Sequence, residues 1–345
     1  NQSGCGPSAD RGAVRGAIAR ELRVEGARME RNLALEVVRA TEAAALAAAR
    51  FIGKGDERMA DRVAIEAMRN TLNSIGFEGK IVVGEGDRDA SDLLYTDEIV
   101  GTGAGPEVDV ALDALEGSLI CATGGPNALS CVALAERGKL LRCPDTYMDK
   151  IACGPIGRGV MDLDRSPTDN LKALAEAKSV YVEDLRVAIL DRPRHEKLIA
   201  EVRRAGAGIK MLTAGDLSAG IATTRPESEI DLLIGVGGAH QGVLAAAAIR
   251  SAGGEMQCRF TPRNAQETEA CLAAGILDLQ RKFTLEEMAG DNVMFAATGV
   301  TTGDYLRGVR FLSGGAMTNS VVMRSKTRTI RFIEAIHHFD FKPEY

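Results

Sequence analysis

Between residues 184 and 251 this chain alternates short apolar segments of strand character with longer amphipathic segments, and this alternation constrains its fold most. The predicted strands and helices alternate in the order 184–190, 195–205, 209–212, 217–222, 231–234 and 241–251. Strands that alternate with helices are typical of parallel βαβ units. The sequence therefore predicts an α/β fold in this part of the chain.

The first half of the chain has a different order of elements. Apolar residues recur at steps of three and four in two long segments, each followed by glycine, which predicts two amphipathic helices. Three short strands are expected after them. These helices and strands cover residues 29–52, 56–75, 80–83, 108–115 and 130–136.

The order of predicted strands and helices differs between the two halves, which predicts a domain boundary near residue 175. A chain of 345 residues, 45% of them hydrophobic, is long enough for two domains or for one large layered unit. We expect residues 1–28 to form a poorly ordered leader or a short helix, residues 29–175 a first lobe, and residues 176–345 an α/β lobe that includes the C-terminal strands. The last predicted strands, 293–297 and 320–330, can belong to either sheet.

Charge and cysteine content exclude several classes of protein. The 42 basic and 48 acidic residues give a formal net charge of -6, the wrong sign for a dedicated nucleic-acid-binding protein. No apolar run approaches the ~20 residues needed to cross a bilayer, so no membrane partner is expected. The seven cysteines are odd in number and form no C-x-x-C pair, which favours a reducing compartment and argues against a zinc site. We expect a soluble intracellular protein.

Acidic side chains stand at the ends of predicted elements in the first half. Glu85 follows the first strand, between two glycines. Asp113 lies near the end of the second strand, and Glu116 lies in the turn that follows it. Asp56 and Asp61 lie at the start of the second helix. Each alone also fits an ordinary role as a helix N-cap or a turn residue. Together they favour an oxygen-rich site for Mg²⁺ or Mn²⁺, because carboxylates, water and phosphate hold such hard cations.

Seven segments, in this order along the chain, resemble the class II fructose-1,6-bisphosphatases, including the bifunctional fructose-1,6-/sedoheptulose-1,7-bisphosphatases. They are GKGDERMAD, IVVGEGDRD, LDALEGS, PDTYMDK, DRPRH, GVGGAHQGV and VMRSKTRTIRFIEAIH, and the likeness extends from about Leu33 to Phe339. The D-x-x-E-G-S pattern also resembles the broader lithium-sensitive, metal-dependent sugar phosphatase superfamily. The resemblance implies a layered αβαβα fold, with two sheets sandwiched by helices. It further implies that residues 29–175 form a metal-binding phosphatase lobe and residues 176–345 an α/β sugar-phosphate-binding lobe. It also implies hydrolysis of the C1 phosphate of fructose 1,6-bisphosphate, sedoheptulose 1,7-bisphosphate or both.

The resemblance further implies roles for individual residues. The implied metal ligands are Asp56, Glu85, Asp113 and Glu116. Asp61 is the candidate to orient or deprotonate the attacking water, and Ser118 is the hydroxyl beside the reacting phosphate. The implied substrate-binding residues are Gly117, Ser118, Tyr147, Arg192, Arg194, His195 and Asp216. Paired arginines suit a non-reacting anchor phosphate because their planar N–H forks match its geometry.

Departures from the family pattern leave a second hypothesis open. Gln241 stands where the family has a metal-binding glutamate, and Ala214 replaces the first of two sugar-binding aspartates. Ala114 stands at a usual proline, and the segment 254–274 is shorter than usual. The alternative is a catalytically degenerate homologue that acts as a structural or regulatory subunit. A third hypothesis is an inositol monophosphatase-like or nucleotide phosphatase activity on the same scaffold. The arginine pair favours a bisphosphate, because a monophosphatase has little use for a second phosphate-binding site.

The remaining expectations concern assembly and compartment. The resemblance to this family implies a homodimer or a homotetramer. The compartment can be the cytoplasm or the plastid stroma. The sequence leaves open the six-carbon or seven-carbon substrate and the choice between Mg²⁺ and Mn²⁺.

Overall fold

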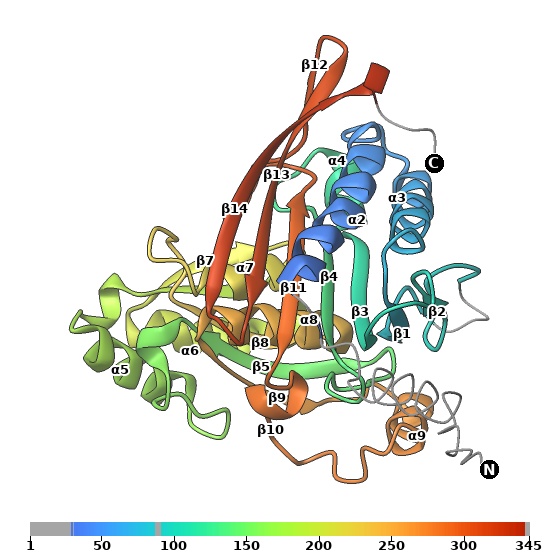
Figure 1. The fold of residues 1–345 in the computed structure, drawn as a ribbon. Coiled ribbons are helices and arrows are strands. Elements are labelled where there is room, and N and C mark those ends of the chain that lie inside the picture. The colour runs from blue at the N-terminus through green and yellow to red at the C-terminus, as the bar shows by residue number, and fades with distance from the viewer. Residues whose placement is uncertain (1–28, 30, 87–90, 342–345) are drawn as a thin grey trace, which may run out of the picture.

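The computed structural model describes residue 29 and residues 31–86 and 91–341, so the expected leader, residues 1–28, lies outside the described residues. Two mixed β-sheets and the helices around them make up the described chain (Figure 1). None of the helices in this described part is long and apolar enough to cross a membrane.

The first sheet takes its strands from both ends of the described chain. They are β1 (Glu78–Val83), β2 (Ile99–Val100), β3 (Glu107–Glu116), β4 (Leu129–Glu136), β11 (Val293–Gly299), β12 (Arg310–Leu312), β13 (Gly315–Arg324) and β14 (Thr329–His338). Their order is β12-β13-β11-β4-β3-β1-β2, and β14 pairs with β13. In this described sheet β1 and β3 are parallel, and the other pairs are antiparallel.

The second sheet contains the predicted βαβ alternation. Its strands are β5 (Tyr147–Cys153), β6 (Arg186–Leu190), β7 (Gly208–Leu212), β8 (Leu232–Gly238), β9 (Glu255–Phe260) and β10 (Phe283–Thr284). Their order is β10-β9-β5-β8-β6-β7. β6 is parallel to both β7 and β8, which confirms the predicted parallel units, whereas β5 is antiparallel to β8 and β9.

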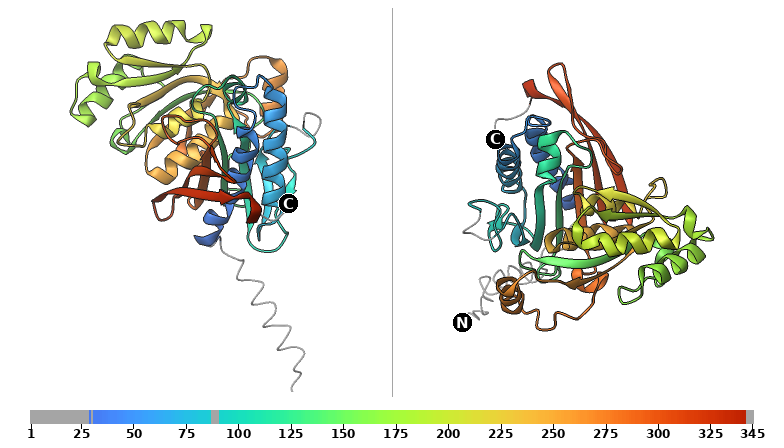
Figure 2. Two further views of the ribbon diagram at one scale, coloured as in Figure 1. Left: turned by 90° about the horizontal axis from the view of Figure 1, so that it is seen from above. Right: turned by 180° about the vertical axis from the view of Figure 1, so that it is seen from behind.

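The helices separate the two sheets and cover their outer faces. They are α2 (Arg31–Ala49), α3 (Glu57–Leu72), α4 (Ser118–Thr123), α5 (Pro167–Lys178), α6 (Glu196–Ala205), α7 (Asp216–Ala222), α8 (Ala239–Ala252), α9 (Ala265–Ala273) and α10 (Leu285–Met288). Figure 2 shows α2 and α3, in blue, on the side of the molecule away from α5 and α6, in green to yellow. α7 and α8 pack between the sheets. The expected αβαβα layering is therefore confirmed.

α8 is the helix that brings the two sheets together. Its sequence AHQGVLAAAAIRSA is apolar on nearly every side, and every residue from Gly242 to Ile249 is buried. A helix that is apolar all round is stable only when neighbours cover all of it. Its alanines let both sheets approach closely, and its first turn, which carries Gln241, lies at the junction between them.

One predicted strand proved wrong. The segment 320–330 is not one strand but the end of β13, a turn, and the start of β14. The polar run from Ser325 to Arg328 reverses the chain, and Arg328 has a positive φ of 47° there. Both strands are ten residues long and pair along their whole length. The sequence pattern merged them because apolar residues stand on both sides of the turn.

The two sheets take strands from both sides of residue 175. β5 precedes this position but belongs to the second sheet, whereas β11, β13 and β14 follow it and belong to the first. The expected lobes 29–175 and 176–345 are therefore not the same as the two sheets. The late strands return to the first sheet, one of the two possibilities left open by the sequence.

Candidate active site

The parallel neighbours β1 and β3 bring three of the predicted carboxylates to one edge of the first sheet. β1 ends just before Glu85, and Asp113 and Glu116 lie in the last four residues of β3. The C-terminal ends of parallel neighbours lie at the same edge of a sheet. The Oε1 atom of Glu85 accepts a hydrogen bond of 2.7 Å from the backbone N–H of Ala114, so the two strand ends are in direct contact.

Asp113 is the centre of this carboxylate cluster. Burial raises the pKa of Glu85, and the charge of Asp113 raises it further. The same two causes, in the same order, raise the pKa of Glu116. Burial also raises the pKa of Asp113 itself, although hydrogen bonds with Glu116 and Gln241 oppose this. Buried carboxylates that repel one another hold protons above their ordinary pKa.

The start of α3 adds further acidic side chains to the cluster. Burial, followed by the charges of Asp113 and Glu57, raises the pKa of Asp61 from 3.8 to about 6. Asp56 is exposed and caps α3, because its Oδ1 accepts a 3.0 Å hydrogen bond from the N–H of Met59. The structure therefore places Asp61 against the cluster and gives Asp56 the N-cap position that its sequence context also allowed.

Gln241 lies against the same cluster. Its Nε2 atom donates a 3.1 Å hydrogen bond to Oδ2 of Asp113 from the first turn of α8. Glutamine is neutral, so it supplies a hydrogen-bond donor where a glutamate would supply a further negative charge. The presence of glutamine rather than glutamate at position 241 therefore acts directly on Asp113.

The chemistry of these donors fits a hard divalent cation. Burial raises the pKa values of Asp61, Glu85, Asp113 and Glu116, and the charge of Asp113 raises those of Asp61, Glu85 and Glu116 further. A cation would offset this cost of burying negative charge. Within the described residues no group of three or more His, Cys, Asp or Glu side chains is already arranged as a ligand set. Backbone and Gln241 donors instead hold Glu85 and Asp113.

A basic and aromatic cluster lies on the second sheet. Arg194 donates from Nε and Nη2 to the carbonyl oxygen of Val236, at 3.1 and 2.8 Å. Its guanidinium carbon lies 4.8 Å from the centre of the Tyr147 ring. Arg192 donates to the carbonyl oxygens of Asp191 and Thr213, each at 2.7 Å. Among the described residues neither arginine forms an ion pair. Because no described carboxylate neutralises these two positive charges, both can attract an anion.

A buried ion pair lies between the two clusters. Lys150 Nζ donates to Asp216 Oδ2 at 2.6 Å and to the carbonyl oxygen of Gly238 at 2.7 Å, and only 2% of the lysine side chain is exposed. Asp216 also contributes to the raised pKa of Glu116, after burial and Asp113. A Cβ atom on Gly237 would collide with Asp216 Oδ2, so the chain needs glycine at this close approach.

Residues 31–337 match the family model of the glpX-encoded bacterial fructose-1,6-bisphosphatases. The chain belongs to this family. One relative, the D-fructose 1,6-bisphosphatase class 2/sedoheptulose 1,7-bisphosphatase of Synechococcus elongatus, is 40% identical over 337 residues, 90% of this chain and 98% of the relative. The protein of the same name from Thermosynechococcus vestitus is 40% identical over 338 residues, 90% of this chain and 97% of the relative. The resemblance stated from the sequence motifs is confirmed.

His195 has a different environment from the one expected of a substrate-binding residue of this bisphosphatase family. Its ring is buried, its Nδ1 lies 2.7 Å from the carbonyl oxygen of Leu190, and its Nε2 accepts a 2.9 Å hydrogen bond from the N–H of Val236. These bonds fix the neutral tautomer with the proton on Nδ1. Burial lowers the pKa of His195, in agreement with a neutral ring. Both nitrogens are used by backbone, so His195 positions Val236 rather than offering a donor to a sugar phosphate.

Ser118 and Gly117 lie beside the carboxylate cluster, at the start of α4. Gly117 adopts a positive φ of 84°, which turns the chain from β3 into this short helix. The hydroxyl of Ser118 donates to Oε1 of Glu57 at 2.7 Å. Glu57 thus connects α3 to α4, and it also contributes to the raised pKa of Asp61, after burial and Asp113.

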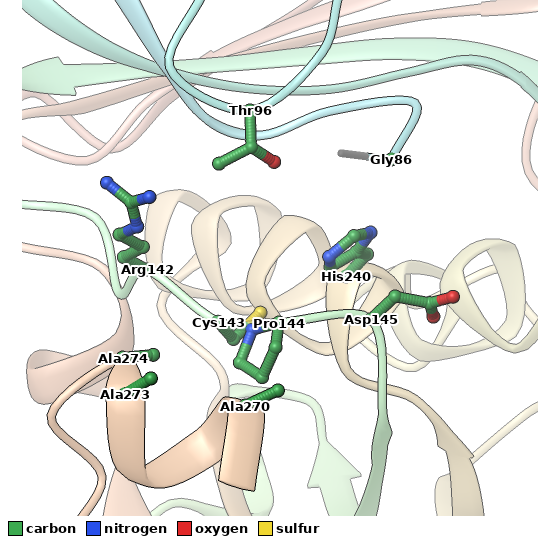
Figure 3. A pocket seen from close by; sticks show the side chains of 10 residues that line it. All are labelled: Gly86, Thr96, Arg142, Cys143, Pro144, Asp145, His240, Ala270, Ala273 and Ala274. Atoms are coloured by element: carbon green, nitrogen blue, oxygen red, sulfur yellow. The ribbon is translucent and has the colours of Figure 1, made fainter. Parts of the chain in front are cut away.

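A cavity of about 550 Å³ is lined by residues that neighbour Glu85 and Gln241 in the chain (Figure 3). Gly86 and His240 line it, and they directly follow Glu85 and precede Gln241 in the chain. The other walls come from Thr96, the segment Arg142–Asp145, and α9 with the residue that follows it. The cavity thus contacts chain neighbours of two site residues, whereas none of the four carboxylates lines it.

Sequence reasoning missed three functional candidates, namely Glu57, Lys150 and Arg263. Lys150 had a readable signal, because it alternates with Met148 and Ala152, and all three are buried on one face of β5. A lysine at a buried position of a strand indicates a charge with an internal partner. Glu57 and Arg263 carried no comparable signal, since the contact of Glu57 with Ser118 and that of Arg263 with the Tyr147 ring join segments far apart in the chain.

Proposed function

We propose that this chain hydrolyses the C1 phosphate of fructose 1,6-bisphosphate, sedoheptulose 1,7-bisphosphate or both, with Mg²⁺ or Mn²⁺ as the cofactor. The observation that carries the proposal is the position of the two clusters at the junction of β8 and α8. Val236, which accepts the hydrogen bonds of Arg194, and Gln241, which donates to Asp113, are five residues apart in the chain. One substrate with two phosphates can therefore reach the arginines and the carboxylates together.

The residues of each cluster suit one end of such a substrate. Arg192, Arg194 and Tyr147 would bind the phosphate that does not react, because arginine forks give paired charge-assisted hydrogen bonds to phosphate oxygens. Asp216, held by Lys150, would accept hydrogen bonds from sugar hydroxyls. Ser118 and the backbone after Gly117 would donate to the reacting phosphate.

Asp56, Glu85, Asp113 and Glu116 would hold the cation. When bound, the cation lowers the pKa of a water, polarises the phosphoryl oxygens and stabilises the leaving alkoxide. Asp61, whose pKa is raised to about 6 by burial and then by Asp113 and Glu57, is suited to orient the attacking water and to accept its proton. The reaction transfers the phosphoryl group to this water, breaks the bond to the C1 oxygen, and returns a proton to that oxygen.

Phosphate release from fructose 1,6-bisphosphate, measured with Mg²⁺ and with Mn²⁺, tests the proposal. Folded protein should release phosphate with at least one of the two metals and should be inhibited by Li⁺. No release with either metal would contradict the enzyme proposal and favour the degenerate homologue. The contact between Gln241 and Asp113 supports this second hypothesis, because a neutral amide occupies the position of a metal-binding carboxylate.

The substitution Gln241→Glu separates the two hypotheses. If the protein is an enzyme with one ligand exchanged, Gln241→Glu should lower the metal concentration for half-maximal activity roughly 10-fold, because a hard cation prefers carboxylate to amide. A relic with a damaged sugar pocket should gain no turnover. The measurement is a metal titration of activity, together with calorimetric titration of metal into the protein without substrate.

Gln280→Glu is the matched control for this titration, because Gln280 is exposed and its side chain lies outside both clusters. It should leave the metal requirement of the protein as it is. An equal metal requirement in wild type and active Gln241→Glu would contradict the proposed position of the cation beside Asp113.

We also propose that the chain assembles as a homodimer or homotetramer and acts in the cytoplasm or the plastid stroma. Support for assembly comes from β14, where Ile330, Phe332 and Ile336 are 38%, 52% and 59% exposed on one face of the strand. A row of large apolar side chains on an outer strand suits a protein interface. Light scattering that gave only the chain mass of 36.6 kDa would contradict the assembly.

A further inference from the structure

Tyr147 is flanked by two arginines that come from different parts of the chain. The guanidinium carbon of Arg194 lies 4.8 Å from the ring centre, and that of Arg263 lies 4.3 Å from it. Arg194 follows β6, whereas Arg263 immediately precedes the N-cap of α9. Two guanidinium groups at one ring concentrate positive charge beside the proposed anchor site.

Arg263 is held firmly by the first turn of α9. Its Nε and Nη2 atoms both lie 2.6 Å from Oε1 of Glu267, and its backbone N–H donates to Oε2 at 2.9 Å. Glu267 is buried, accepts a 2.8 Å hydrogen bond from Thr146 Oγ1, and has its pKa lowered to about 2, chiefly by the hydrogen bond from Arg263. Thr146 precedes Tyr147, so a continuous set of contacts fixes Arg263 relative to the tyrosine.

Both arginines use the same side of the guanidinium group for their hydrogen bonds with the protein backbone or with Glu267. Arg194 uses Nε and Nη2 for Val236, and Arg263 uses the same two atoms for Glu267. Within the described part of the chain, no hydrogen bond uses Nη1 of Arg194, whereas Arg263 also forms a side-chain hydrogen bond with Tyr147. About half of the Arg263 side chain, 46%, is exposed, so solvent-borne anions can reach it.

We infer that Arg263 is a third arginine of the anchor site and binds the phosphate of the substrate that does not react, together with Arg194 and Tyr147. This inference rests on the proposed function, because it specifies one more contact of the same site. Glu267 offsets one of the two positive charges, so the cluster keeps a net positive charge that a phosphate can neutralise. The competing explanation is that Arg263 only supports the Tyr147 ring through a cation–π contact.

The test compares Arg263→Gln, Arg194→Gln and wild type with two substrates, fructose 1,6-bisphosphate and fructose 1-phosphate, which lacks the anchor phosphate. Loss of one charge-assisted hydrogen bond should raise KM for the bisphosphate roughly 10-fold, with a much smaller change in kcat. The ratio of kcat/KM for the bisphosphate to that for the monophosphate should fall by a similar factor. Arg263→Lys, which keeps the charge but loses the fork, should recover only part of this ratio.

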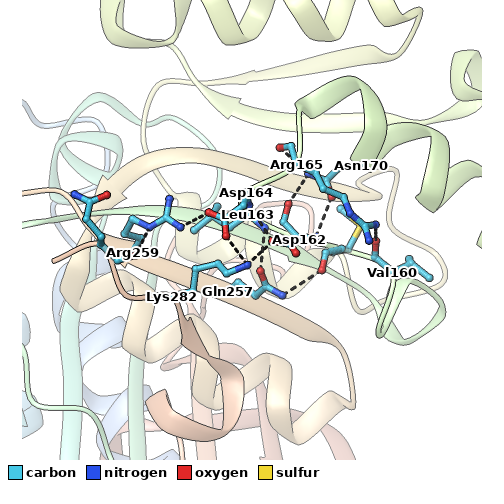
Figure 4. A network of polar contacts seen from close by, with 11 residues as sticks. Val160, Asp162, Leu163, Asp164, Arg165, Asn170, Gln257, Arg259 and Lys282 are labelled. Carbon is cyan, nitrogen blue, oxygen red and sulfur yellow. Dashed lines mark hydrogen bonds and ion pairs between the residues drawn. The ribbon is translucent and has the colours of Figure 1, made fainter. Parts of the chain in front are cut away.

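Arg259→Gln is the matched control. Arg259 lies on β9 in a separate polar network, with Asp164 and Gln280 as its partners and Lys282 nearby (Figure 4). It carries the same charge as Arg263 but has no contact with Tyr147 in the described chain. Its substitution should leave the substrate ratio as in wild type.

The outcomes separate this inference from the proposed function. A fall in the ratio for Arg194→Gln but not for Arg263→Gln overturns the inference and leaves the function standing. An equal loss for both substrates in Arg263→Gln assigns it to support of the ring alone and also overturns the inference. If wild type releases no phosphate, the proposed function fails. Calorimetric titration of fructose 6-phosphate into wild type and Arg263→Gln then tests whether Arg263 binds the anchor phosphate. Binding weakened roughly 10-fold by Arg263→Gln supports the third arginine, and equal binding overturns it.

Discussion

The substitution Asp113→Asn should lower turnover of fructose 1,6-bisphosphate by on the order of 100-fold or more while the protein stays folded. Asp113 contributes to the raised pKa values of Asp61, Glu85 and Glu116, so its carboxylate faces all three. Asparagine keeps the shape but removes the charge that a cation needs. Steady-state kinetics over a range of metal concentrations, with circular dichroism to check folding, measure this effect.

The same substitution should stabilise the metal-free protein at neutral pH. The pKa of Asp61 is raised in the folded protein from 3.8 to about 6, so the folded state binds more protons than the unfolded state between these values. Stability then falls as the pH rises through this window and stays lower above it. Asp113→Asn removes one cause of this loss, so its melting temperature should exceed that of wild type near pH 7.5. The difference should vanish near pH 4, where the carboxylates are protonated in both proteins.

Asp109→Asn is the matched control on the same strand. Asp109 is buried near the start of β3, where its Oδ2 accepts hydrogen bonds from the N–H groups of Lys139 and Leu140, at 2.8 and 3.2 Å. Its substitution should cost stability without the metal-dependent loss of turnover. Equal activity of Asp113→Asn and wild type would show that Asp113 does not hold the cation.

The carboxylate cluster was predictable because each member carries a local signal. Glu85 stands between glycines at a strand end, and Asp113 and Glu116 end the next strand along the sheet. Parallel pairing of these strands is enough to bring their ends together. The sequence motif also gave the place of Gln241, although only the structure joins its amide to Asp113.

The surroundings of His195 could not be predicted, because the motif DRPRH gives residue types but not hydrogen-bond partners. Both ring nitrogens are bonded to backbone atoms of β6 and β8. The contacts of Tyr147 were hidden for a related reason. Arg263 follows it by more than a hundred residues, and periodic patterns say nothing about which loops meet. Local pattern thus predicted the elements and the acidic residues, whereas pairing between distant segments determined the neighbours of each side chain.

The substitution Lys150→Met should lower the free energy of unfolding by about 3–5 kcal/mol, because it leaves the carboxylate of Asp216 buried without its partner. The ion pair has 2% of the lysine side chain and 10% of the aspartate side chain exposed. Methionine also loses the 2.7 Å hydrogen bond to the carbonyl oxygen of Gly238, at the junction of β8 and α8. Urea unfolding followed by circular dichroism measures the change.

Lys178→Met is the matched comparison, because Lys178 pairs with Asp231 at a site where 29% of its side chain is exposed. Because 15% of the Asp231 side chain is also exposed, this pair is partly solvated, and its substitution should cost less than Lys150→Met. The double substitution Lys150→Met/Asp216→Leu removes both buried charges and should recover much of the lost stability. It should not recover activity, because Asp216 is the proposed partner of the sugar hydroxyls. Equal costs for Lys150→Met and Lys178→Met would contradict the conclusion that Lys150 holds Asp216 in place through a buried charge pair.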